Sequence, residues 1–347
     1  MNQDPDPTFV YRSDDHDANN PYADPGLLDR SQDPPALGGD AESMSGEMSA
    51  KGRPRVWTVF VALMLGLVLA VGFQVLWGIV MGVIEAGRGT PPQQIGPKLM
   101  SLLSDPWVFL LILVMSQAGF ALAAWIGISR SPIPWRHRIA WRRPRAGWHV
   151  YPVTMLSSLL PLAFGLWAAI QVAKVIPADT SLEGLFDNFT VSSGIAFVVL
   201  IGLLPGVIEE VLFRGYVQTR LVHRWGAVIG IAVTSILFAL VHGGPHAIAA
   251  AAWLGCWFGY LAFRSDSIWP TIGCHIFVNS GLNAYRLLVM WLGWTEGTQT
   301  VIAWGATIVG SIFFAVCLWP GYWQSAREQE ADDADAAEMP TTVLGGQ

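Results

Sequence analysis

Hydrophobic residues are concentrated in eight segments of the chain, and most polar positions lie between them. A helix that crosses a membrane needs about 20 consecutive, mostly apolar residues. The first such segment, residues 56–84, contains no charged side chain. The eight segments cover residues 56–84, 106–129, 149–173, 193–212, 225–242, 247–263, 271–292 and 301–319. This pattern predicts an all-α fold, a polytopic bundle of about eight transmembrane helices.

The composition agrees with a membrane protein and separates two tails from the bundle. Hydrophobic residues make up 52% of the chain and charged residues 13%, whereas soluble domains carry about 25% charged residues. Acidic, polar residues fill positions 1–50 and 321–347, which cannot bury a core and are predicted to be disordered. We therefore divide the remainder into a two-helix region with a basic loop, residues 51–147, and a core, residues 148–320.

Lysine and arginine positions predict the orientation of the bundle. Short cytoplasmic loops of membrane proteins carry an excess of these residues. An N-terminus in the cytoplasm leaves only Arg88, Lys98 and Lys174 outside. We expect a multi-pass protein of the plasma membrane with both termini cytoplasmic. The stretch RHRIAWRRPR lies between two spans, so it predicts a loop near anionic lipid, and no nucleic-acid partner is expected. The cations assigned to the cytoplasm are Lys51, Arg53, Arg55, Arg130, Arg136, Arg138, Arg142, Arg143, Arg145, Arg220, Arg224, Arg264 and Arg327.

The fourth segment ends in three charges that a spanning helix would normally avoid. An ionisable side chain at the bilayer centre costs at least ~2.5–3.5 kcal/mol, so it usually faces the protein interior and serves a function. Glu210 and Arg214 lie four residues apart on one helical face, which fits a structural ion pair. Glu209 points roughly 100° away and is not accounted for by that pair.

Histidine and asparagine side chains extend this polar group to two further helices. Phe238 and His242 are four residues apart on the fifth segment. His275, Asn279 and Asn283 repeat every four residues on the seventh and form one polar stripe. If the chain turns near residues 223–226, Glu209 and His242 lie ~22 and ~27 Å from the turn, at similar depths. His275 reaches that depth only if its helix begins early or is broken.

The order of these motifs resembles a known family. Glu-Glu-x-x-x-Arg at 209–214, Phe-x-x-x-His at 238–242 and His-x-x-x-Asn at 275–279 are similar to the three motifs of the CAAX-protease and bacteriocin-processing (Abi) family of intramembrane endopeptidases. The resemblance implies a helical membrane peptidase. It implies that Glu209 activates water beside His242, that His275 and Asn279 stabilise the oxyanion, and that Glu210, Arg214 and Phe238 give structural support. His246 matches no motif position.

The residue types also fit peptide hydrolysis by themselves. Hydrolysis needs a base for water and donors facing the developing oxyanion, which a carboxylate and His or Asn side chains provide. His242, His275 and Glu209 could equally form a catalytic zinc site. We favour water activated by glutamate without a required cofactor, because no HExxH motif is present and asparagine is a poor zinc ligand.

Two other functions use the same polar cluster. A proton-coupled transporter would employ Glu209, His242 and His275 as a relay, and a non-catalytic membrane scaffold would use the cluster to bind partners. The hydrolase interpretation instead predicts a membrane-associated protein or peptide substrate, of the CAAX type or otherwise, met in the lipid bilayer. Gly255 and Gly259 predict helix packing within the chain. Cys256, Cys274 and Cys317 have no metal-binding or CxxC spacing, so buried packing is expected for them.

Overall fold

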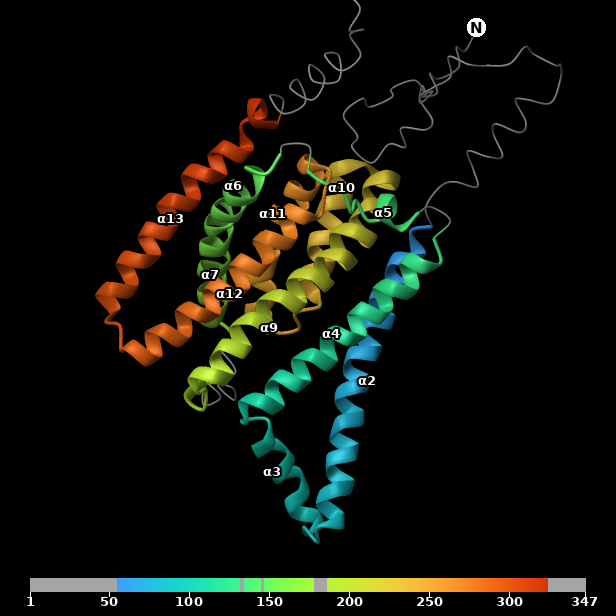
Figure 1. Cartoon of the computed structure of the whole chain (residues 1–347), viewed down its shortest axis with the longest axis vertical. Helices are drawn as coiled ribbons and strands as arrows, with labels where there is room; N and C mark the ends of the chain where they lie inside the picture. The colour runs from blue at the N-terminus through green and yellow to red at the C-terminus, as the bar shows by residue number, and fades with distance from the viewer. Residues whose placement is uncertain (1–54, 132–133, 145–146, 178–185, 324–347) are drawn as a thin grey trace, which may run out of the picture.

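The computed structural model describes residues 55–131, 134–144, 147–177 and 186–323, and every regular element within these ranges is helical (Figure 1). Residues 1–54 and 324–347, which hold nearly all of the two predicted tails, lie outside the described residues. The helices are α2 Trp57–Gly87, α3 Pro92–Leu102, α4 Pro106–Ser129, α5 Trp135–Arg138, α6 Val150–Ser157, α7 Leu159–Ala173, α9 Val191–Glu210, η2 Val211–Gln218, α10 Thr219–Leu240, α11 Pro245–Ser265, α12 Trp269–Leu292 and α13 Glu296–Leu318.

The helices form an integral membrane bundle, as the hydrophobic pattern predicts. Six helical stretches of the described chain are long and apolar enough to cross a membrane. One of them, Val191–Leu240, contains the fourth predicted segment and all but the last two residues of the fifth, and α12 with its polar stripe is not among the six. The number eight therefore stays a prediction, while the all-α class is confirmed.

The predicted turn between the fourth and fifth segments is present at Gly226. This residue has φ 79° and ψ 169°, a conformation that glycine adopts at little steric cost. The chain then returns along itself so closely that a Cβ atom on Gly230 would lie 2.5 Å from the backbone nitrogen of Val222. Glu209 and His242 consequently lie on two antiparallel arms, as the depth estimate requires.

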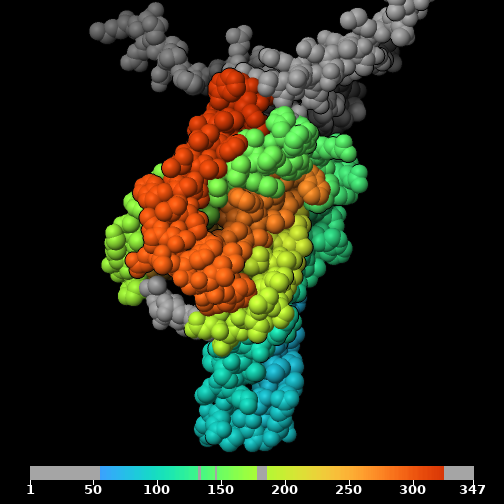
Figure 2. Space-filling model, turned by 60° about the vertical axis from the view of Figure 1, so that its left-hand side comes forward, coloured from blue at the N-terminus to red at the C-terminus, as the bar shows by residue number. Residues whose placement is uncertain are grey.

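Two groups of helices pack around α9. The hairpin of α2 and α4 contacts α9 and η2 from one side, and α12 lies along the other side of α9. At the α9–α12 contact, a Cβ atom on Gly206 would meet the Ile276 side chain at 2.5 Å, so the helices approach closely. The far end of the hairpin, with α3, projects beyond the other helices (Figures 1 and 2).

The basic loop between α4 and α6 is packed onto the bundle rather than fully solvated. Ile139 and Ala140 are buried, and the Ile268 backbone N–H donates to the Ala140 carbonyl at 3.2 Å. Arg142 forms an ion pair with the buried Asp266 at the turn between α11 and α12. The loop therefore fixes the start of α12, the helix that carries the His–Asn stripe.

The cysteines differ in part from expectation. Cys274 and Cys317 are buried, whereas Cys256 is exposed. The expectation of buried packing is therefore wrong for Cys256, which lies at an exposed position of α11.

Candidate active site

Glu209 and Glu210 are the last two residues of α9, where the helix changes its hydrogen-bond pattern. The next eight residues, Val211–Gln218, form a π-helix. π-helical turns are rare in proteins, and those that occur are often found at functional sites. Both carboxylates are buried, with Glu210 completely inaccessible and Glu209 8% exposed. The two neighbours have different partners, which separates their roles.

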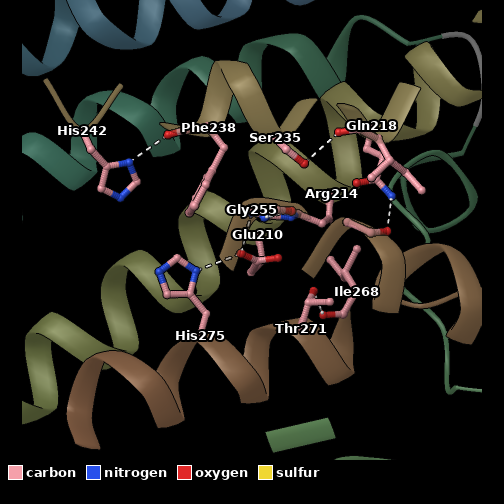
Figure 3. A network of polar contacts seen from close by, with 12 residues as sticks. Glu210, Arg214, Gln218, Ser235, Phe238, His242, Gly255, Ile268, Thr271 and His275 are labelled. Atoms are coloured by element: carbon pink, nitrogen blue, oxygen red, sulfur yellow. Dashed lines mark hydrogen bonds and ion pairs between the residues drawn. The ribbon is translucent and has the colours of Figure 1, made fainter. Parts of the chain in front are cut away.

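Glu210 accepts hydrogen bonds from two side chains, those of Arg214 and His275. Its Oε1 atom accepts a hydrogen bond from Arg214 Nη1 at 2.8 Å and another from His275 Nδ1, also at 2.8 Å (Figure 3). The ion pair with Arg214 that the spacing predicts is therefore present, and His275 joins it. This arrangement ties the end of α9 to α12 and fixes the orientation of the His275 ring.

Arg214 is fully buried between α9, α10 and α11. Its Nη2 atom donates to the Gly255 carbonyl at 3.1 Å, and its guanidinium lies 4.3 Å from the centre of the Phe238 ring. Gln218 repeats the pattern one turn later and donates to the Gly259 carbonyl at 2.8 Å. The predicted packing of Gly255 and Gly259 within the chain is confirmed, because side chains there would collide with α10.

Glu209 is held from a different helix, α4. Its Oε1 atom accepts a hydrogen bond from Gln117 Nε2 at 2.9 Å, across 92 positions of sequence. Its Oε2 atom is buried without a hydrogen-bond partner, as is Oε1 of Gln117. Two unpaired acceptors thus flank one buried hydrogen bond. The sequence interpretation missed Gln117, although it is the one long polar side chain between residues 106 and 129.

His242 lies just past the end of α10, in a turn rather than inside the helix. Its Nδ1 atom is 2.8 Å from the Phe238 carbonyl, and the residue is exposed. Because a carbonyl only accepts, Nδ1 carries the hydrogen and Nε2 is left as an acceptor in the neutral ring. The Phe238 ring makes edge-to-face contacts with both histidines: its centre lies 4.9 Å from the centre of the His242 ring and 5.9 Å from that of the His275 ring (Figure 3). Phe238 thus lies between the two imidazoles.

Asn279 and Asn283 continue the polar stripe of α12 toward α9. The Asn279 side chain donates to the Ile201 carbonyl at 3.2 Å, and Asn283 donates to the Asn279 carbonyl at 2.8 Å. Since α12 begins at Trp269, His275 lies in its second turn and reaches the end of α9. The helix begins two residues before the expected start, and His275 contacts Glu210 at the end of α9.

The structure gathers the three motifs at one level of the bundle without joining all their side chains. Among the described residues, no hydrogen bond connects Glu209 with His242, His275 or Asn279. The same residues include no group of three or more His, Cys, Asp or Glu side chains placed to hold a metal ion. The zinc arrangement of His242, His275 and Glu209 stays an alternative that metal depletion tests.

Comparison with known proteins places these residues in one matched region. Residues 191–281 match the family model "Type II CAAX prenyl endopeptidase Rce1-like". No curated protein and no solved structure matches the chain. The matched region runs from the start of α9 into α12 and contains all three motifs. Residues 191–281 are therefore similar to the Rce1-like CAAX prenyl endopeptidases, which confirms the resemblance drawn from the three motifs.

Proposed function

We propose that the protein is an intramembrane endopeptidase in which Glu209 activates water for attack on a peptide bond. The observation that carries the proposal is the contrast between the neighbouring carboxylates. Oε2 has no hydrogen-bond partner among the described residues in either carboxylate. Glu210, however, is inaccessible and is paired with Arg214 and His275, whereas Glu209 is 8% exposed and is bonded only by the neutral Gln117 side chain. A base must be reachable by water and must not already be neutralised by a cation, and of the two carboxylates Glu209 meets both conditions.

The proposed reaction assigns one role to each polar side chain. Glu209 takes a proton from water as the oxygen attacks the peptide carbonyl, and that proton passes to the leaving amine. Glu210 holds Nδ1 of His275, so Nε2 is the ring atom left to face substrate, and it donates to the oxyanion when protonated. Asn279 has a second amide hydrogen beyond the one given to Ile201. His242, at the exposed edge of the site, offers its Nε2 atom as a hydrogen-bond acceptor for the water that Glu209 activates.

The proposed substrates are membrane-associated proteins or peptides. The matched family is named for CAAX prenyl endopeptidases, which supports substrates of the CAAX type. The bundle of apolar helices supports contact with such substrates in the bilayer. Loss of cleavage by the Glu209→Gln variant, developed in the Discussion, tests this function against the transporter and scaffold alternatives.

We further propose that Gln117 positions Glu209. Removing the hydrogen bond at 2.9 Å should let the carboxylate rotate away from the attacking water. A hydrogen bond to a charged group contributes about 1.5–3 kcal/mol, so we expect kcat to fall about 10- to 100-fold in Gln117→Ala, with KM unchanged. Steady-state kinetics on the purified variants measures both constants.

Two further variants separate this role from packing. Gln117→Met preserves the volume of the side chain and should lose as much activity as Gln117→Ala. Ser116→Ala, on the adjacent position of α4, should behave as wild type. Full activity in Gln117→Met would show that Gln117 only fills space between α4 and α9.

The proposed orientation places α5 in the cytoplasm and α3 outside. Single cysteines at the exposed positions His137 and Gln93 report on these two sides, after replacement of Cys256, Cys274 and Cys317. We expect a membrane-impermeant thiol reagent to label position 93, and not 137, in intact cells, because the arginines concentrate on the side of α5. The reverse labelling pattern would overturn the orientation.

A further inference from the structure

A pocket of about 470 Å³ lies between α4, α5 and the end of α9, outside the group of motif residues. Its walls are apolar and aromatic, and Ser129 is the only hydroxyl, amide or charged side chain among its lining residues. Trp125 and Trp135 at its edge are 65% and 46% exposed. Such a lining offers a peptide backbone almost no hydrogen-bond partners, whereas it suits a hydrocarbon chain.

Two arginines, Arg130 and Arg136, lie next to lining residues of this pocket. The Arg136 guanidinium lies 5.3 Å from the centre of the Trp135 ring, which lines the pocket. Arg130 is exposed and directly follows the lining residue Ser129. No aspartate or glutamate occurs from residue 106 to residue 178, so no carboxylate of this stretch neutralises the two arginines. The nearby Asp266, in the turn between α11 and α12, is paired with Arg142. An apolar cavity thus opens beneath a cationic edge.

We propose that this pocket binds an anionic phospholipid, with an acyl chain between α4 and α9 and the phosphate at Arg130 and Arg136. Basic pockets between transmembrane helices on the cytoplasmic side favour anionic headgroups. Tryptophan side chains favour the level of the headgroups, where Trp125, Trp135 and Trp141 would then lie. The charge of the edge selects an anionic over a zwitterionic lipid, and the apolar lining selects a lipid over a free phosphate.

The lipid would lie against the contact that holds Glu209 in place. Val207, Ile208 and Val211 line the pocket on both sides of the two glutamates in sequence. On α4, the lining residues Ala121 and Ala124 follow Gln117 by one and two helical turns. Filling the pocket should therefore stabilise the packing of α4 on α9. Binding itself does not depend on the proposed peptidase activity.

The test measures lipid binding to the purified full-length protein. Native mass spectrometry in neutral detergent, with phosphatidylglycerol and phosphatidylcholine of identical acyl chains, gives the bound fraction at each lipid concentration. We expect tighter binding of phosphatidylglycerol and a rise in the thermal unfolding midpoint when it is added. Arg130→Gln and Arg136→Gln should each weaken its binding about fivefold. Binding should also weaken as salt increases.

Control variants distinguish the pocket from a general surface effect. Arg143→Gln removes an exposed arginine of the same loop whose charge acts on Tyr151 of α6, not on a lining residue, and it should leave binding unchanged. Ala121→Phe fills the pocket, and Trp135→Ala removes an exposed part of its wall with little risk to folding. Both should weaken binding without changing the charge. Equal affinity for the two lipids, an effect of Arg143→Gln as large as that of Arg136→Gln, or unchanged binding in both pocket variants would overturn the proposal.

Discussion

Glu209→Gln is expected to lower the rate of peptide cleavage by at least ~10²-fold while leaving substrate affinity unchanged. Glutamine keeps the shape and can still contact Gln117, but it cannot accept the proton of water at Oε2. Loss of a general base typically costs 10²–10⁴-fold. Affinity should survive because Glu209 acts in the transition state and is not required to hold the bound substrate. Single-turnover cleavage and equilibrium binding of the same peptide measure the two effects.

Variants of two other motif residues, His242 and Asn279, extend this experiment, and a variant of His246 serves as its control. The rate of cleavage should fall in His242→Ala about as much as in Glu209→Gln. In Asn279→Ala it should fall by ~10²–10³-fold if Asn279 donates to the oxyanion. His246 lies four residues after His242 and bonds the Ile176 carbonyl at 2.9 Å, with no role in the reaction. His246→Ala should therefore cleave almost as well as wild type. Normal cleavage by the Glu209, His242 and Asn279 variants together would favour a transporter or a scaffold.

Arg214→Ala is expected to destabilise the fold by about 3–5 kcal/mol, because it leaves the Glu210 charge buried without its main partner. Glu210→Gln should be comparably harmful, since it weakens the contacts to both Arg214 and His275. The yield in detergent and the thermal unfolding midpoint measure these losses. Arg143→Gln, at an exposed position, serves as the control for simple loss of an arginine.

The double variant Glu210→Leu with Arg214→Met tests why the single variants are unstable. It separates the cost of an unpaired buried charge from the loss of the attraction between the two side chains. Replacing both partners of a buried pair by apolar side chains is often neutral or stabilising. We therefore expect the double variant to be more stable than either single one. Glu209→Gln should unfold close to wild type, because its neutral side chain still fits beside Gln117. If Glu209→Gln proves as unstable as Arg214→Ala, the division into a base and a structural pair is wrong.

Local periodicity was sufficient to predict several features of the fold. The apolar run of residues 106–129 gives both ends of α4, and the interruption around residues 223–226 gives the turn at Gly226. The spacing of Glu210 and Arg214 gives their ion pair. Each of these features depends on residues that are neighbours along one helix. The pattern does not predict α3, because this helix has 11 residues, too few for a membrane-spanning segment.

Contacts between distant helices could not be predicted in the same way. The bond between Gln117 and Glu209 depends on which face of α4 meets α9, and no pattern within either helix specifies that pairing. His275 reaches Glu210 rather than Glu209 because Gly206 lets α9 approach Ile276 closely and sets the register with α12. The π-helix after Glu210 further alters which side chains share a face.

The metal question bears directly on the proposed role of Glu209. The Nδ1 atoms of His242 and His275 bond the Phe238 carbonyl and Glu210, so Nε2 is the ring atom that each histidine could offer to a substrate or to a metal ion. We propose that the Glu209 carboxylate activates the water without a metal ion. A zinc enzyme would instead lose all activity to a chelator and regain it with added zinc.

The most direct measurement uses purified wild-type protein and Glu209→Gln, each treated with a chelator and reconstituted into vesicles with a membrane-anchored peptide. Mass spectrometry of the peptide identifies any cleaved bond. The account predicts cleavage at internal peptide bonds by the metal-depleted wild type and at least ~10²-fold less by Glu209→Gln. Equal cleavage by the two proteins, or cleavage by the wild type only after zinc is restored, would contradict it.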